Sequence, residues 1–393
     1  MKLLQKMKDG VYMLPAVHWE RRLFDSLIPL PDGTSYNAYL VKGSEKTALI
    51  DTADPMKAET LMEQLQGVEK LDYIVANHAE QDHSGCIPLV LQKYPDAKVL
   101  ATPKAKPMLM DLLLVPEEKI VTVEDGETLS LGDKTLRFIH APWVHWPETM
   151  FTYLEEDKIL FTCDFLGSHL ATSEMYATDE CRVYEAAKRY YSEIMMPFRP
   201  SIQKNLDKIK DLAIEIIAPS HGPAYNKPQF IIDAYHSWVY DEPGNIAVIP
   251  FVSMHGSVKK MVEHLEAALV ERGVIVKPFD LTVTDLGQLA MALVDAATAV
   301  IGTPAVLAGA HPAAVYAAYI ANAVRPKTKF VSIIGSYSWG SKAIDQLSGL
   351  ITNLKAEVIP PVFIKGFPKD EDFKALEKLA DTIAQKHREN NLK

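Results

Sequence analysis

Short apolar runs bounded by turn residues dominate the first 240 residues of the chain. They predict strands at residues 47–52, 71–77, 98–102, 135–141, 150–154, 159–163 and 214–219. Apolar residues at helical spacing predict helices at 56–66, 87–94 and 184–212, the last interrupted by Pro197 and Pro200. Strands and helices mixed in this way indicate a layered α/β or α+β domain.

The pattern changes after residues 241–245, a polar segment with adjacent Pro and Gly that is typical of a linker. Beyond it, strands predicted at 246–252, 274–279, 299–302, 329–334 and 357–362 alternate with helices at 258–272, 286–296, 313–323, 341–354 and 370–388. This strict alternation predicts a doubly wound parallel sheet of flavodoxin size. We therefore expect two domains, residues 1–243 and 244–393.

Composition narrows the classes of function. The 393 residues include 41 Lys and Arg against 51 Asp and Glu, and the net charge of −10 argues against binding nucleic acid. Cys86, Cys163 and Cys181 form no CxxC pair, which excludes a disulfide framework and an iron–sulfur cluster of the usual spacing. Without a secretory signal or an apolar run of membrane-spanning length, we expect a cytoplasmic protein with no membrane partner.

The densest candidate chemistry directly follows the strand predicted at 71–77. Four potential metal ligands stand within six residues there, namely His78, Glu80, Asp82 and His83. They converge on one point only if the loop wraps around an ion. Three further candidates stand at the ends of other predicted strands: His145, Asp164 and His221. A polar loop with a helix cap at Asp82 or Ser84 is the alternative, but it leaves these matching residues without a role.

The pattern HxExDH, followed by a distal His, Asp and His, resembles the metallo-β-lactamase fold, whose hydrolases usually carry HxHxDH. Glu80 takes the place of the second histidine, and a carboxylate suits iron or manganese better than zinc. Iron can also change its oxidation state, which zinc cannot. This combination is similar to the flavodiiron proteins. Family-like segments are WERRLF at 19–24, TSYNAYL at 34–40, HWPETM at 145–150 and SHGP at 220–223.

The resemblance implies a role for each candidate ligand. One iron is expected on His78, Glu80 and His145, and the other on Asp82 and His221, with Asp164 bridging the two. His83 is expected either to bind the second iron or to turn toward solvent.

The resemblance also places a tyrosine of the long helix near the irons. We expect Tyr191 in this catalytic position, next to Tyr190, with packing of both in the core as the alternative. For His169, a role close to the metal ligands or the substrate pocket and a simple turn role are equally consistent with the sequence.

Three loops at strand ends in the second half suit a flavin nucleotide. Residues 253–258 combine hydroxyls and Gly before a helix, an arrangement whose backbone N–H groups cradle phosphate. Residues 302–310 and 335–340 follow the third and fourth predicted strands. Val258, Ala305 and Ala308 stand where hydroxyl or amide residues are more usual. The expected FMN contacts are Ser253, Met254, His255, Gly256, Ser257, Val258, Pro304, Ala305, Val306, Leu307, Ser336, Tyr337, Ser338, Trp339 and Gly340.

The resemblance covers nearly the whole chain, residues 10–386. It implies an N-terminal metallo-β-lactamase-like αββα domain and a C-terminal flavodoxin-like doubly wound parallel sheet. The implied activity is reduction of dioxygen to water or of nitric oxide to nitrous oxide at a non-haem diiron site, with electrons supplied through FMN. It further implies a head-to-tail homodimer or dimer of dimers. The implied electron donor is separate: a rubredoxin, a flavoprotein reductase or a reduced deazaflavin.

Two other functions are consistent with parts of the sequence. A zinc metallohydrolase with a structural flavodoxin-like domain would fit Ala305 and Ala308, but Glu80 argues against it. A flavodoxin-like electron carrier with a structural N-terminal domain would leave the converging ligands without a role.

Overall fold

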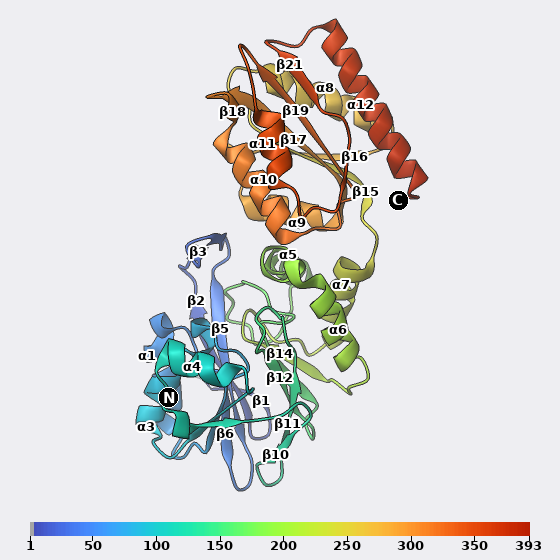
Figure 1. Ribbon diagram of the computed structural model, residues 1–393. Coiled ribbons are helices and arrows are strands. Elements are labelled where there is room, and N and C mark those ends of the chain that lie inside the picture. The colour runs from blue at the N-terminus through green and yellow to red at the C-terminus, as the bar shows by residue number, and fades with distance from the viewer. Residues whose placement is uncertain (1–3) are drawn as a thin grey trace. The chain divides into compact units, whose positions relative to one another are not determined.

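The structure, a computed structural model, describes residues 4–393, and the chain divides into two compact units (Figure 1). Unit 1 contains the chain up to Tyr191 together with Phe198–Val239. Unit 2 contains Ser192–Pro197 and Tyr240–Lys393. No helix of residues 4–393 is both long and apolar enough to cross a membrane.

Two sheets form the centre of unit 1. The first has the strand order β1 (Gln5–Lys8), β2 (Val11–His18), β5 (Thr34–Lys42), β6 (Thr47–Ile50), β7 (Tyr73–Val75), β8 (Lys98–Ala101) and β9 (Ile120–Thr122). The second has the order β10 (Thr128–Ser130), β11 (Thr135–His140), β12 (Met150–Leu154), β13 (Ile159–Cys163) and β14 (Ile216–Pro219). A small hairpin pairs β3 (Leu23–Phe24) with β4 (Ile28–Pro29).

The alternation of side chains along the strands explains how these sheets stack. In β2, Val11 and Met13 pack in the core between the two sheets, while Leu14 and Ala16 face helices on the outside. Those helices are α1 (Ala58–Gln64), α3 (Ile87–Lys93) and α4 (Ala105–Leu113). Behind the second sheet lie α5 (Glu180–Tyr190), α6 (Arg199–Ile209) and α7 (Pro228–Tyr240). The unit is therefore a four-layer αββα sandwich (Figure 1).

Short helical turns complete unit 1 and its connection to unit 2. They are the 3₁₀ turns Pro55–Lys57, Leu65–Gly67, Glu117–Lys119 and Met196–Phe198, the short helix α2 (Gln81–Ser84), and the π turn Tyr191–Met195. The interruption predicted within residues 184–212 is present, and the segment is divided into α5, two turns and α6. Pro197 and Pro200 each remove a backbone donor, and the helix breaks around them.

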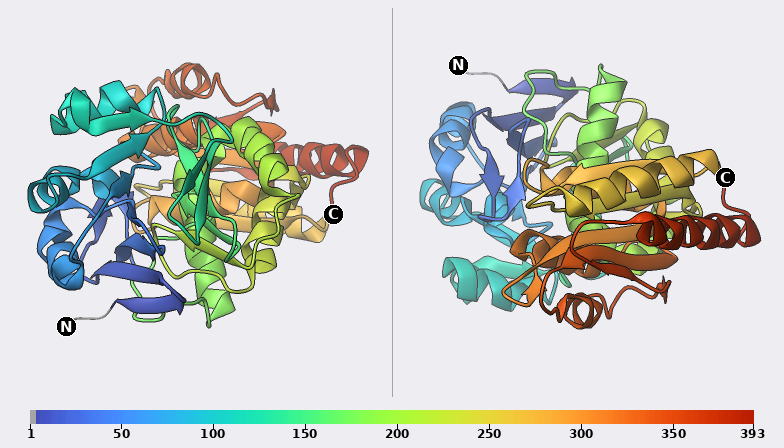
Figure 2. Two further views of the ribbon diagram at one scale, coloured as in Figure 1. Left: turned by 90° about the horizontal axis from the view of Figure 1, so that it is seen from below. Right: turned by 90° about the horizontal axis from the view of Figure 1, so that it is seen from above.

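Unit 2 contains a parallel sheet with helices on both faces. Its strand order is β16 (Ile275–Asp280), β15 (Gly244–Phe251), β17 (Ala296–Val306), β19 (Phe330–Tyr337) and then β20 (Glu357–Val358) and β21 (Val362–Lys365). One face packs against α8 (Ser257–Glu271) and α12 (Asp370–Glu389), which lie side by side in Figure 2. The other face packs against α9 (Leu286–Asp295), α10 (Pro312–Val324) and α11 (Ala343–Leu350).

Two details of unit 2 differ from the sequence-based expectation. The fifth strand is split in two because Pro360 and Pro361 cannot donate ladder hydrogen bonds. The third strand continues to Val306 and turns back as β18 (Gly309–Ala310), where an open loop was expected. Leu307 and Ala308 form the turn with φ of 51° and 62°, the left-handed values of a tight hairpin.

Gly335 is expected to be essential for the stability of unit 2. A Cβ at this position would lie 2.0 Å from the Thr303 carbonyl oxygen and 2.4 Å from a ring carbon of Phe363. Gly335→Ala should therefore lower the free energy of unfolding by about 2–4 kcal/mol. Gly349→Ala is the control, because a Cβ meets nothing there and Ala suits a helix better than Gly. Denaturant unfolding checks this, and equal midpoints for the two variants would contradict it.

Candidate metal centre

All seven predicted metal ligands come together in unit 1, as two groups. His78, Glu80, His145 and Asp164 form the first group, and Asp82, His83 and His221 form the second. The ligand atoms of each group lie within 4.8 Å of one another. The groups come from segments far apart in the sequence, so the tertiary fold assembles the site.

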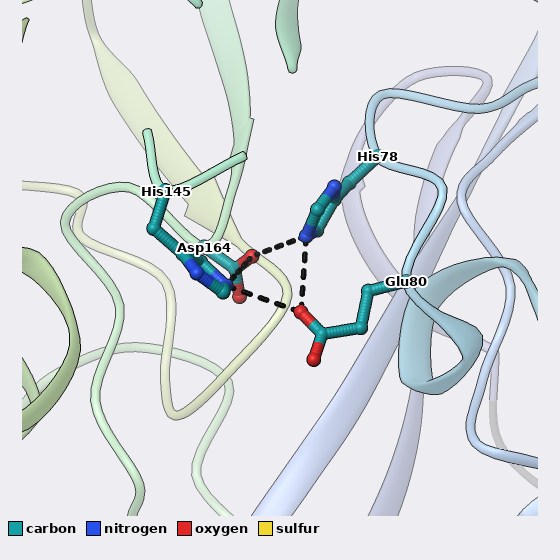
Figure 3. Close-up of side chains that lie close together, drawn as sticks. All are labelled: His78, Glu80, His145 and Asp164. Carbon is teal, nitrogen blue, oxygen red and sulfur yellow. Dashed lines mark hydrogen bonds and ion pairs between the residues drawn. The ribbon is translucent and has the colours of Figure 1, made fainter. Parts of the chain in front are cut away.

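The first group consists of two imidazoles and two carboxylates that point toward one another (Figure 3). Glu80 Oε2 lies 3.1 Å from both His78 Nε2 and His145 Nε2. Asp164 Oδ2 lies 3.4 Å from His78 Nε2 and 3.7 Å from His145 Nε2. These spacings are those of ligands that surround a common point.

The second group uses the other oxygen of Asp164. Asp164 Oδ1 lies 2.9 Å from His83 Nε2 and 3.2 Å from His221 Nε2. Asp82 supplies one oxygen to each of these histidines, at 3.3 Å and 3.2 Å. Each oxygen of Asp164 therefore belongs to a different group, which is the arrangement of a bridging carboxylate. His83 is buried with its Nε2 turned inward rather than toward solvent.

Among the ligand atoms that lie at these short distances, four make no hydrogen bond: both oxygens of Asp82, His83 Nε2 and Asp164 Oδ2. Their neighbours lie close, but at angles that do not suit a proton between them. Unpaired buried carboxylates are costly unless a cation neutralises them. Imidazole and carboxylate donors together suit iron and manganese. The residues therefore fit two bound metal ions.

Strand ends position most of these ligands. His78 follows β7 by three residues, and the loop continues into α2 with Asp82 and His83. Asp164 directly follows β13, and His221 follows β14, which pairs with β13 in parallel. The carboxyl ends of parallel neighbours lie at the same edge of a sheet, which brings Asp164 and His221 together.

Backbone and side-chain acceptors orient the imidazoles. Glu148 Oε1 lies 2.7 Å from His78 Nδ1 and also accepts from the Ala79 N–H at 3.0 Å. The Ser35 carbonyl lies 2.7 Å from His221 Nδ1. Such partners leave Nε2 to face the metal and raise its basicity. Sequence reasoning missed Glu148, although it stands only three residues after His145 in a family-like segment.

The tyrosine next to the ligands is Tyr190, where we had expected Tyr191. The Tyr190 hydroxyl donates to Asp164 Oδ1 at 2.7 Å, whereas the Tyr191 hydroxyl lies 3.4 Å from the Trp238 carbonyl. Consecutive side chains of a helix point about 100° apart, so only one of two neighbours can face the site. His169 also lies here, with its ring 4.8 Å from those of His221 and Tyr190.

Charge pairing shifts the pKa values of the site residues more than burial does. Burial alone would lower the pKa of His221, but the Asp164 and Asp82 carboxylates raise it to about 10. Burial likewise opposes protonation of His78, yet Glu148 and Glu80 hold its pKa well above the usual value. Burial would raise the pKa of Asp164, yet His83 and His221 hold it well below the usual range. The metal-free site therefore carries protons on His78 and His221 at neutral pH.

Metal loading is expected to release protons at pH 7. His221 must lose its proton to bind a metal, so affinity should rise as the pH increases toward about 10. The pairing of protonated His221 with Asp164 and Asp82 stabilises the metal-free fold. This stabilisation is fully present when the pH is below 6.5, the ordinary pKa of histidine, and it disappears as the pH rises through about 10. A pH indicator in weak buffer, during anaerobic addition of ferrous iron, measures the release. Loading without proton release would contradict the expectation.

A separate cavity of about 330 Å³ opens in unit 2 at the carboxyl ends of its strands. It lies at the switch point of the sheet, where β15 is flanked by β16 and β17. Ten of the expected flavin contacts line it: Met254, His255, Ser257, Pro304, Ala305, Ser336, Tyr337, Ser338, Trp339 and Gly340. The Ser257 and Ser336 hydroxyls lie 2.7 Å apart at the start of α8. Hydroxyls and a helix N-terminus together suit a phosphate group.

Five expected contacts do not line this cavity. Val258 is fully buried in the core beneath the sheet, so its side chain cannot meet a ligand. Ser253 Oγ accepts from the Lys259 N–H, and Gly256 adopts a φ of 85° before α8. Val306 and Leu307 belong to the unexpected hairpin, and Leu307 is 95% exposed.

Sequence reasoning missed Gly366 and Phe367 as cavity-lining residues, and it placed Ala308 in a flavin loop without naming it as a contact. Gly366 and Phe367 follow the fifth strand. The carboxyl end of this strand lies at the same edge of the sheet as those of the other parallel strands. Gly366 and Phe367 could therefore have been identified from their place just after a predicted strand.

Comparisons with known proteins agree with this geometry. Residues 34–222 match the model of the ODP family beta lactamase. A nitric oxide reductase of Moorella thermoacetica is 36% identical over 96% of this chain and 97% of its own. A flavo-diiron protein, FprA2, of Clostridium acetobutylicum is 31% identical over 97% of this chain and 98% of its own.

A solved structure confirms the predicted fold class. The rubredoxin oxygen:oxidoreductase of Desulfovibrio gigas superposes with a TM-score of 0.94, covers 98% of both chains and is 27% identical. The matched lengths of these relatives cover nearly the whole chain and therefore both units. The chain therefore belongs to the flavodiiron protein family.

Proposed function

We propose that this protein reduces dioxygen to water, or nitric oxide to nitrous oxide, at a diiron centre that receives electrons through FMN. The observation that carries the proposal is Asp164, whose two oxygens serve two ligand groups, one of which contains Glu80 in place of an imidazole. The names of relatives support both gases: one is called nitric oxide reductase and another rubredoxin-oxygen oxidoreductase.

Each ligand has a distinct task in this proposal. His78, Glu80 and His145 would hold one iron, Asp82, His83 and His221 the other, and Asp164 both. When bound, the irons would supply single electrons to a diatomic gas at open coordination positions. Negative charge from Glu80 favours ferric over ferrous iron, and Glu148 fixes the ring of His78. Tyr190 holds a proton 2.7 Å from Asp164 Oδ1, close to where gas reduction consumes protons.

Residues 244–393 would bind FMN in the cavity of unit 2, and residues 1–243 would carry the irons. Ser257 and Ser336 would hold the phosphate, while Tyr337 and Trp339 offer aromatic faces to the ring system. Bound FMN would accept electrons in pairs and release them singly. Pro304, Ala305 and Ala308 form an apolar wall, so binding would depend on stacking and backbone contacts there.

A separate partner would supply the electrons. Relatives named rubredoxin-oxygen oxidoreductase and coenzyme F420H2 oxidase support a rubredoxin or a reduced deazaflavin as donor, and a flavoprotein reductase is a third proposed donor. We also propose a head-to-tail homodimer or dimer of dimers, because the ligands and the flavin cavity belong to different compact units. The free thiols of Cys86, Cys163 and Cys181 support a reducing, cytoplasmic location.

Anaerobic purification followed by iron and flavin assays tests this function. A yellow protein with iron and FMN should consume dioxygen or nitric oxide when supplied with a generic reductant, and the two gases are compared side by side. Removal of FMN should stop transfer from a protein donor while iron stays bound. A colourless zinc protein, or an iron- and FMN-loaded protein that consumes neither gas, would refute the proposal.

A further inference from the structure

Three aromatic side chains that can be oxidised by one electron form a buried cluster in unit 1. Tyr191, Tyr235 and Trp238 contact one another with ring centroids 5.2–5.4 Å apart. All three are at most 2% exposed. Tyr235 and Trp238 lie on α7, one helical turn apart, and Tyr191 follows the last residue of α5. This spacing is typical of aromatic rings in direct packing contact.

The inner end of the cluster reaches the bridging ligand. Tyr190, the residue before Tyr191, donates its hydroxyl hydrogen bond to Asp164 Oδ1 at 2.7 Å. Phe165 follows Asp164 in the chain and packs edge-on against Tyr235 at 5.4 Å. A phenol bonded to a carboxylate can lose an electron and pass its proton to that carboxylate in the same step.

The outer end of the cluster reaches solvent through one further ring. Trp238 Nε1 donates to the Tyr184 hydroxyl at 3.0 Å, and the two rings are 5.2 Å apart. Tyr184 is partly exposed on α5. Ring contacts thus lead from Tyr191 and Tyr235 to a phenol at the surface. Tyr190 connects them to the metal-bridging carboxylate as the neighbour of Tyr191 in the chain.

We propose that these side chains form an electron-transfer chain between the metal site and the surface, in the order Tyr190, Tyr191 with Tyr235, Trp238 and Tyr184. Tyrosine and tryptophan are the aromatic residues that lose an electron most readily, whereas phenylalanine does not take part. The packing contacts favour short steps between neighbours. The polar ends of Tyr190, Trp238 and Tyr184 have partners that can share or accept a proton.

The role of this chain in turnover rests on the proposed function. With iron bound and FMN unable to give an electron, Tyr190 would supply one electron to the oxidised site, and its phenolic proton would shift along the 2.7 Å hydrogen bond toward Asp164 Oδ1. Tyr190 regains the proton and takes an electron from Trp238 through Tyr191 and Tyr235. Trp238 is restored by Tyr184, whose phenolic proton leaves to water. A soluble thiol then returns a hydrogen atom to Tyr184, and two such oxidised thiols couple to a disulfide.

The chain can be tested without either gas. Cys181 is exposed on α5, three residues before Tyr184, whereas Cys86 and Cys163 are buried. A ruthenium photo-oxidant can therefore be attached to Cys181 alone in the full-length protein. A laser flash with a sacrificial electron acceptor then creates one oxidising equivalent at the label. Transient absorption distinguishes tyrosyl from tryptophanyl radicals and, in protein loaded anaerobically with ferrous iron, records the formation of ferric iron.

We expect the metal-free protein to show tyrosyl and tryptophanyl radicals, and the ferrous protein to show ferric iron in their place. Trp238→Phe should lose the tryptophanyl signal and the ferric signal. Tyr184→Phe should slow the appearance of both signals. It removes the acceptor of the Trp238 Nε1 hydrogen bond, so circular dichroism checks that the variant is folded. Tyr153→Phe is the matched control. This buried tyrosine donates a hydrogen bond to the Ala213 carbonyl and is not one of the five proposed electron-transfer residues. It should behave as the wild type does.

Equal rates of ferrous oxidation in the wild type, Trp238→Phe and Tyr184→Phe would overturn the proposal. This outcome is independent of the proposed function, which fails if the protein is a colourless zinc protein or if the iron- and FMN-loaded protein reduces neither gas.

Discussion

Asp164→Ala is expected to deprive the protein of both metal ions, while substitution of any other ligand should affect mainly one. Asp164 Oδ2 faces His78 and His145, and Asp164 Oδ1 faces His83 and His221. Loss of a residue that merely orients a ligand already weakens binding by about 10–100-fold, so loss of this shared ligand should exceed about 100-fold at each position. Iron assay after gel filtration measures the result.

Asp164→Asn separates the charge of this residue from its shape. The amide keeps the size of the side chain but offers one neutral oxygen, so metal should be lost nearly as completely. Asp32→Ala removes a surface carboxylate that pairs with Arg182 and should retain full iron. Circular dichroism should show the same helix content in all variants. Full iron in Asp164→Ala would mean that the carboxylate does not bridge the metals.

Glu80→His is expected to exchange iron for zinc and to abolish gas reduction. Glu80 Oε2 lies 3.1 Å from the Nε2 atoms of His78 and His145, so an imidazole there would create a nitrogen-rich group of the kind that zinc prefers. Burial would raise the pKa of Glu80, but the two histidines lower it. The Glu80 carboxylate therefore stays ionised. Iron retention and turnover should each fall by on the order of 100-fold.

Gln81→His is the matched control for this substitution. It adds an imidazole at the neighbouring position, which is exposed, without removing a ligand. Its iron content and turnover should match those of the wild type. If purified Glu80→His kept its iron when incubated with a weak chelator, this result would contradict the ligand role of Glu80.

The ligand set could be predicted because its members follow a rule of position. Asp164 and His221 stand just beyond neighbouring parallel strands, whose ends lie close in space whatever the connections between them, and His78 stands just beyond a strand of the other sheet. Glu148 follows no such rule. It acts through a contact with His78, and only the folded loop between β11 and β12 makes that contact.

The flavin cavity was predicted less completely for a similar reason. The loops after the first and fourth strands could be located from the alternation of strands and helices. The hairpin of β17 and β18 could not, because a run of Ala, Val, Leu and Gly residues suits a strand, a turn and a loop equally. Pairing of Ala305 with Ala310 decides between them.

The sequence by itself determined the two-part organisation, the alternation of strands and helices in the second half, and which residue types could bind a metal. These properties depend on local periodicity and on chain order. The tertiary structure alone decided that His83 turns inward, that Tyr190 and not Tyr191 meets Asp164, and that each Asp164 oxygen serves a different ligand group. The direction of a side chain depends on its packing against segments distant in the chain, and no local pattern contains that information.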